Sequence, residues 1–165
     1  MKQNRRVSWA DIDGQTHSYD FRDYMTIVAQ ARYVIRKVQM IIDGCARELG
    51  IGSLEHQALI QIYGATGGAI PVGQLAERLN IVPALASRLV QQLDAAGFVT
   101  RSPSEEDRRT MLVSSTGPGE RLLCQIVEIA HQKVEAFRLG TTERERAAAH
   151  EIIAFYVGGP PPGRA

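Results

Sequence analysis

A stripe of polar side chains on one predicted helix has the residue types and spacing that bind nucleic acid. Its outward positions carry Ser87, Arg88 and Gln91, next to Ala84. An arginine can pair bidentately with guanine or with a phosphate, a glutamine can bind adenine, and a serine can donate to a phosphate. Ala84, or the flanking Leu85, can touch a thymine methyl group. A solvated face of an ordinary amphipathic helix has the same pattern, so the stripe alone leaves both interpretations open.

A charged loop follows that helix and favours the first interpretation. Asp107, Arg108 and Arg109 stand at the start of the second strand of a predicted hairpin. One arginine can be held by Asp107 while the other projects into a narrow minor groove. As an isolated turn, the loop would contribute only weak surface pairs of about 0–1 kcal/mol each. The predicted DNA contacts are Ala84, Leu85, Ser87, Arg88, Gln91, Arg101, Asp107, Arg108 and Arg109.

Side chains that could hold a metal or perform catalysis do not form a recognisable motif. The histidines are scattered, at His17, His56, His131 and His150. No glycine-rich phosphate loop or nucleophile elbow is present. Cys45 and Cys124 are too far apart to indicate a disulfide framework or a metal site, and both have the pattern of small core residues. We therefore expect neither an enzyme nor a cofactor nor a metal.

Composition places the chain among ordinary globular proteins. Hydrophobic residues make up 44% and charged residues 22%, and the formal net charge is +1. That charge is weak support for nucleic-acid binding, which therefore depends on where the basic residues lie. No apolar run approaches the ~20 residues of a membrane span, and no secretory signal is present, so a cytoplasmic location is expected.

The order of predicted elements is helix, tight turn, helix, glycine and hairpin, which is typical of a winged helix-turn-helix. Apolar residues recur at three- and four-residue spacing over 21–49, 72–79 and 86–93. The fold expected is mainly α with a small β-hairpin wing, placed between N- and C-terminal dimerisation helices. The predicted parts are a mobile arm (1–19), a dimerisation helix (20–52), the winged lobe (53–114), dimerisation helices (115–158) and a disordered tail (159–165).

This ordered series resembles the MarR family of bacterial transcription regulators. The matching residues are 73–79 (GQLAERL), 87–93 (SRLVQQL), 97–99 (GFV), 106–109 (EDRR) and the turn at 116–119 (TGPG). The resemblance covers about 53–123. It implies a homodimer whose terminal helices interlock, with two winged lobes on successive major grooves of a pseudo-palindromic operator. It also implies release of a repressor by a small aromatic or phenolic effector. Many relatives have polar residues where this chain has Val82 to Leu85.

An effector pocket for an aromatic acid needs apolar walls and one or two cations or donors. We expect Tyr33, Arg36 and His56 to supply them, with Arg32, Tyr63 and His131 as further candidates. These side chains are equally consistent with surface, capping or interface roles. Three alternatives remain open: a cysteine redox-sensing regulator, a winged-helix protein-interaction module without DNA binding, and a DNA-binding protein without an effector.

Overall fold

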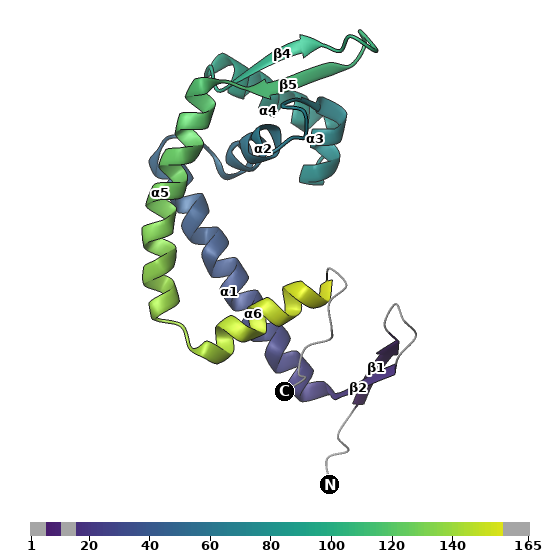
Figure 1. Ribbon diagram of the computed structural model, residues 1–165, viewed down its shortest axis with the longest axis vertical. Helices are drawn as coiled ribbons and strands as arrows, with labels where there is room; N and C mark the ends of the chain where they lie inside the picture. The colour runs from purple at the N-terminus through teal and green to yellow at the C-terminus, as the bar shows by residue number, and fades with distance from the viewer. Residues whose placement is uncertain (1–5, 11–15, 157–165) are drawn as a thin grey trace. The chain divides into compact units, whose positions relative to one another are not determined.

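The computed structural model describes residues 6–10 and 16–156 of the chain (Figure 1). The described part is mainly helical with a small three-stranded sheet, which confirms the predicted fold class. Its elements, in chain order, are β1 (Arg6–Ala10), β2 (Thr16–Asp20), α1 (Phe21–Glu48), α2 (Ser53–Tyr63), β3 (Ile70–Pro71), α3 (Val72–Leu79), α4 (Pro83–Ala95), β4 (Val99–Pro103), β5 (Met111–Ser115), α5 (Gly117–Leu139) and α6 (Glu143–Tyr156).

Two compact units share the long helices α1 and α5. One contains residues 41–133, and the other contains residues 1–40 and 134–165. The first, which we call the winged unit, extends beyond the predicted 53–114 segment at both ends. The reason is burial: Cys45 from α1 and Leu122, Leu123 and Ile126 from α5 belong to the same hydrophobic core as Leu59 of α2.

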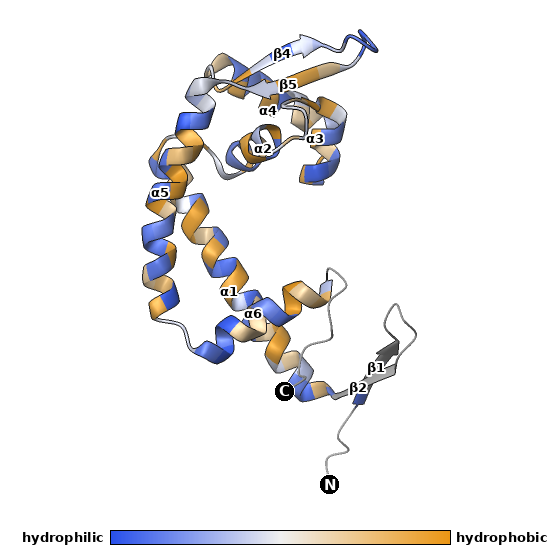
Figure 2. Ribbon diagram, viewed as in Figure 1, coloured by the Kyte–Doolittle hydropathy of each residue, from blue (hydrophilic) through white to orange (hydrophobic). Residues whose placement is uncertain are grey.

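A three-stranded antiparallel sheet with the order β3-β5-β4 forms the wing of the winged unit. In it Ile70 lies opposite Val113, and Arg101 lies opposite the same residue from the other side. Figure 2 shows apolar residues along the inner parts of this unit and a hydrophilic loop at the tip of the hairpin. The hairpin was predicted, with strands shifted by one or two residues, whereas the short strand β3 was not.

Gly97 connects α4 to the wing. Its φ of +75° lies in the left-handed region, where a side chain is strained. The amide of Gly97 donates to the carbonyl of Asp94, and the amide of Phe98 donates to that of Leu93. This closes the helix in the way that the sequence predicts for a C-terminal glycine.

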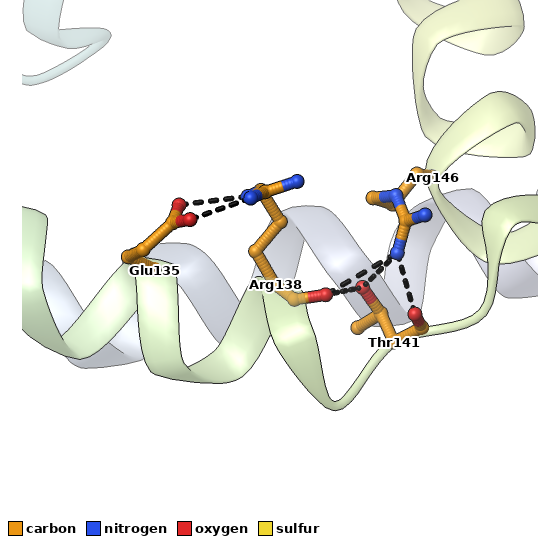
Figure 3. Close-up of polar contacts among 4 residues, drawn as sticks. All are labelled: Glu135, Arg138, Thr141 and Arg146. Atoms are coloured by element: carbon orange, nitrogen blue, oxygen red, sulfur yellow. Dashed lines mark hydrogen bonds and ion pairs between the residues drawn. The ribbon is translucent and has the colours of Figure 1, made fainter.

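The second unit contains the first part of α1, the end of α5, and α6. Its core is small: Ala31, Ala149 and Ile152 are buried, with Ile27, Val28 and Val34 packed against them. At the α5–α6 corner the Arg146 guanidinium donates to the carbonyls of Arg138 and Thr141, and Glu135 pairs with Arg138 (Figure 3). The predicted capping box is confirmed, because Thr142 and Glu145 exchange hydrogen bonds at the start of α6.

Two antiparallel strands occupy part of the segment predicted to be a mobile arm. β1 pairs with β2, with Arg6 opposite Asp20 and Ser8 opposite Ser18. Asp20 then accepts the amide hydrogens of Arg22 and Asp23 and so caps α1. Residues 1–5 and 11–15, and the predicted tail at 159–165, lie outside the described residues. Within the described part, no helix combines the length and apolarity needed to cross a membrane.

Candidate nucleic-acid interface

The turn between α3 and α4 has a tight, left-handed geometry. Asn80 ends α3 with φ 53° and ψ 46°, a conformation that asparagine tolerates better than most residues. The amide of Ile81 then donates to the carbonyl of Ala76, at 3.0 Å. Pro83 starts α4 in the first turn, where its missing N–H costs no helical hydrogen bond. The two helices are therefore joined by three residues, as a helix-turn-helix requires.

Burial on α4 separates its two faces. Ala86, Leu89, Val90 and Leu93 are buried in the winged unit. The opposite face exposes Ala84, Ser87, Arg88 and Gln91, as the helical wheel predicts. Leu85 is half-buried, so Ala84 is the more accessible of the two residues proposed to touch a methyl group.

The loop of the wing is organised by Asp107. One carboxylate oxygen accepts the amide hydrogen of Arg109 at 3.0 Å, and the other accepts the hydroxyl hydrogen of Thr110 at 3.0 Å. The expectation that Asp107 holds an arginine side chain is therefore wrong: it holds the backbone of the turn. Arg108 and Arg109 are exposed, and neither guanidinium forms an ion pair with any side chain that the structure describes.

Arg101 differs from the other wing arginines, because it is already paired. Its Nε lies 2.8 Å from Oδ2 of Asp94, across the Gly97 turn that joins α4 to β4. Both side chains are partly exposed, at 39% and 32%. A pair this accessible contributes little stability and can exchange its partner for a phosphate. Asp94 was not predicted from the sequence; its seven-residue separation from Arg101 around a turn glycine was the available signal.

A groove of about 500 Å³ brings several of the predicted contacts together. Ser87 and Gln91 line it from α4, and Arg101 and Arg109 from the wing. Pro71 at the end of β3, with Val72 and Gly73 at the start of α3, forms another part of its wall. Helix α4 and the wing thus present hydrogen-bond donors to one concave surface, while Arg88 and Arg108 lie outside this groove.

Comparison with known proteins matches this part of the chain to a family. Residues 49–110 match the sequence profile described as the MarR family. The matched segment contains the helix-turn-helix, β4 and the wing loop, so the resemblance predicted from the sequence is confirmed for this segment.

The chain is also similar to the HTH-type transcriptional regulator YfiV of Bacillus subtilis (strain 168). The two are 30% identical over 88 residues, which is 53% of this chain and 55% of that protein. The chain therefore matches little more than half of that relative's length.

Solved structures extend the likeness beyond the matched segment. A MarR transcriptional regulator from Methanosarcina mazei Go1 shares 25% identity, with a TM-score of 0.61 over 79% of this chain and 94% of that one. A MarR variant from E. coli in complex with operator DNA is 20% identical, with a TM-score of 0.64 over 83% and 97% of the two chains. At that identity, the second likeness concerns the fold alone.

Only some of the predicted effector residues lie together. Arg32, Tyr33 and Arg36 of α1 line a groove of about 450 Å³ with Tyr156 of α6. The ring of Tyr33 also contacts that of Phe137 edge-on, with centroids 6.3 Å apart.

The other three candidates belong to the winged unit and do not line that groove. His56 is only 3% exposed, and its Nδ1 has no hydrogen-bond partner among the described groups. Burial lowers the pKa of His56, and the nearby Asp43 opposes part of that effect. The hydroxyl of Tyr63 donates to Glu120 at 3.0 Å, and this hydrogen bond raises the pKa of Tyr63. His131 is exposed on α5.

The two cysteines have different environments. Cys45 is fully buried, as its position on an apolar stripe predicts. Cys124 is exposed, so its prediction as a core residue is wrong. It follows Leu122 and Leu123, which are buried, and the helix turns its side chain away from the core. Among the described residues, no group of three or more His, Cys, Asp or Glu side chains is arranged to hold a metal ion.

Proposed function

We propose that this chain is a dimeric, sequence-specific DNA-binding transcriptional regulator. In this proposal α4 enters the major groove, and the β4–β5 wing lies against the adjacent minor groove or backbone. The observation that carries it is the convergence of Ser87, Gln91, Arg101 and Arg109 on one exposed groove. The regulator names of its relatives and the operator complex of a protein with the same fold support it.

Affinity and its dependence on salt test the DNA-binding proposal. A random duplex library is selected with the full chain, and the enriched sequence is measured by fluorescence anisotropy at several salt concentrations. A binder that neutralises several phosphates shows a steep negative slope of log K against log salt. We expect Arg108→Ala and Arg109→Ala to weaken binding and to reduce the size of that slope by about one for each lost phosphate contact.

Arg144→Ala is the matched control. It removes the same charge from an exposed position on α6, outside the candidate interface. We expect its affinity and salt slope to equal those of the wild type. A salt slope near zero, or wing variants that bind like Arg144→Ala, would contradict the proposal and favour a protein-interaction module.

Exposed apolar side chains support the dimer. The second unit has a small core yet exposes several large hydrophobic side chains, including Met40 at 56%, Leu139 at 74% and Tyr156 at 64%. A unit with so little buried apolar surface gains little stability alone, and a second copy would cover this surface. We expect light scattering to give twice the chain mass, and Met40→Glu or Leu139→Glu to shift it toward a monomer. A monomeric wild type at micromolar concentration would contradict the dimer.

The groove beside α1 supports a small aromatic acid as the effector of a repressor. Its volume of about 450 Å³ suits a small ligand, with an apolar wall at Ile152 and two guanidinium groups, Arg32 and Arg36, one helical turn apart. We expect aromatic carboxylates to raise the thermal midpoint and to release the protein from DNA, whereas the neutral amides do neither. Arg36→Gln should remove the response. A response that is unchanged in Arg36→Gln would place the effector elsewhere.

A further inference from the structure

Helix α4 begins with an exposed apolar edge at the point where it would first approach DNA. Val82 occupies the N-cap position, and its side chain is 65% exposed. Pro83 and Ala84, the next two residues, are exposed as well. Exposed hydrophobic residues are ordinarily scattered singly over a protein surface. Here three consecutive apolar residues are exposed, and they lie beside Ser87 of the candidate interface.

Valine at the N-cap of α4 cannot form the side-chain hydrogen bond that usually stabilises the start of a helix. The N-cap is the site where serine, threonine, aspartate or asparagine accepts a hydrogen bond from the first turn of the helix. Val82 has extended backbone angles, φ −69° and ψ 145°, that suit such a cap, and the structure shows no side-chain cap hydrogen bond. The position therefore lacks the usual stabilising group and exposes a hydrophobic one instead.

Few polar groups remain in the first turn of α4. Pro83 has no N–H, and the amides of Leu85 and Ala86 both donate to the carbonyl of Val82, at 3.0 and 3.2 Å. Ala84 therefore carries the one amide of this turn that is left without a described acceptor. An end of a helix with so few donors is poorly suited to binding a phosphate or the polar edge of a base.

We propose that Val82, together with Ala84, determines sequence specificity by packing against the 5-methyl groups of thymines in the major groove. Thymine is the one standard base that presents a methyl group there, so an apolar contact discriminates without hydrogen bonds. Ser87, Arg88 and Gln91 supply the hydrogen bonds further along the helix. The inference rests on the proposed DNA binding, and it identifies Val82 as a contact that the sequence analysis did not include.

Replacing thymine with uracil tests the contact directly, because uracil differs from thymine by the loss of that methyl group. Each thymine of the selected operator is replaced in turn, and affinity is measured for the chain 1–165. For one buried methyl group we expect affinity to fall about fourfold at one or two positions of each half-site. Val82→Ala should reduce this discrimination at the same positions, while uracil at other positions has no effect in either protein.

Val82→Ser separates a role in DNA reading from a role in folding. Serine supplies the missing cap, so the thermal midpoint should rise by about 2–4 °C. The same variant should lose the preference for thymine over uracil, so stability and specificity change in opposite directions. Val127→Ala is the matched control: Val127 is 62% exposed, but it lies on α5, and its variant should keep the full preference.

The possible outcomes are distinct. If the wild type binds no duplex specifically, the proposed function and this inference both fail. If it binds an operator but no thymine-to-uracil change alters affinity, the inference alone is overturned. It is also overturned if Val82→Ala and Val82→Ser keep the full preference. Loss of the preference in both variants, with retention in Val127→Ala, supports it.

Discussion

Gly119 lies at the start of α5, where the helix passes over the base of the wing. It is buried, and a Cβ added there would lie 2.1 Å from the carbonyl oxygen of Phe98 and 3.3 Å from Cδ1 of Leu59. The same Phe98 oxygen accepts the amide hydrogen of Thr116 at 3.0 Å. A backbone carbonyl held in this way cannot rotate aside. Gly119→Ala must therefore push the start of α5 away from the wing.

The cost can be worked from these distances. A close carbon–oxygen contact is about 3.3 Å, so the new methyl group and the Phe98 oxygen must separate by roughly 1.2 Å. That displacement breaks the bond from Thr116, worth about 1 kcal/mol, and adds about 1–3 kcal/mol for overpacking. We expect the free energy of unfolding to fall by about 3 kcal/mol. For a chain of this size, the thermal midpoint should drop by about 6–12 °C.

Thermal unfolding followed by circular dichroism measures this change, with Gly44→Ala as the matched control. Gly44 lies inside α1, and the atom nearest to an added Cβ is Nη2 of Arg47, 4.0 Å away. There alanine meets no obstacle and favours the helix by about 1 kcal/mol, so this variant should be stabilised. A midpoint for Gly119→Ala within about 2 °C of the wild type would refute the packing described at the base of the wing.

Three further changes have defined outcomes. Asp94→Asn removes the carboxylate that competes with a phosphate for Arg101, so DNA affinity should rise; an unchanged affinity would mean that Arg101 does not reach a phosphate. Because burial lowers the pKa of His56 below 6.5, the unfolded chain binds a proton before the folded one, and the free energy of unfolding should fall as the pH drops below about 6.5. His56→Leu should reduce the pH dependence of the free energy of unfolding measured by urea titration. A pH dependence equal to that of the wild type would contradict this role of His56. Arg146→Met removes three hydrogen bonds to the α5–α6 corner and should cost about 1–3 kcal/mol of unfolding free energy, whereas Arg144→Met should be neutral.

The sequence predicts best those elements in which the apolar pattern continues over many residues. The pattern over 21–49 predicts α1, which spans Phe21–Glu48, because a stripe repeated through many turns leaves little choice of structure. β3 was missed because it has only two residues, one of them a proline, and two residues are too few to show the alternating pattern of a strand. The strands β1 and β2 were missed because they lie in a short polar segment whose pairing partner is set by contact and not by composition.

The residues of the candidate site likewise divide into those that a sequence pattern predicts and those whose roles depend on the folded backbone. A helical wheel is enough to find Ser87, Arg88 and Gln91, because burial of the opposite face fixes their direction. The partner of Arg101 depends on how the Gly97 turn folds α4 back onto β4, and a sequence pattern contains no such distance. The role of Asp107 depends on the path of the backbone in the loop, which decided that its carboxylate binds an amide and not a guanidinium.

In the winged region the positions of the charged side chains matter more than their net charge. Residues 72–121 contain six arginines and six acidic side chains, so their net charge is 6 − 6 = 0. The acidic groups are not equally available, since Asp94 pairs with Arg101, Asp107 accepts hydrogen bonds within the wing loop, and Glu120 accepts one from Tyr63. Each is held close to the protein's own donors. The guanidinium groups of Arg108 and Arg109 have no ion-pair partner among the described residues, so they stay available to a phosphate although Glu105 and Glu106 are exposed in the same loop. Moderate net charge in such a chain therefore limits non-specific attraction without excluding specific binding.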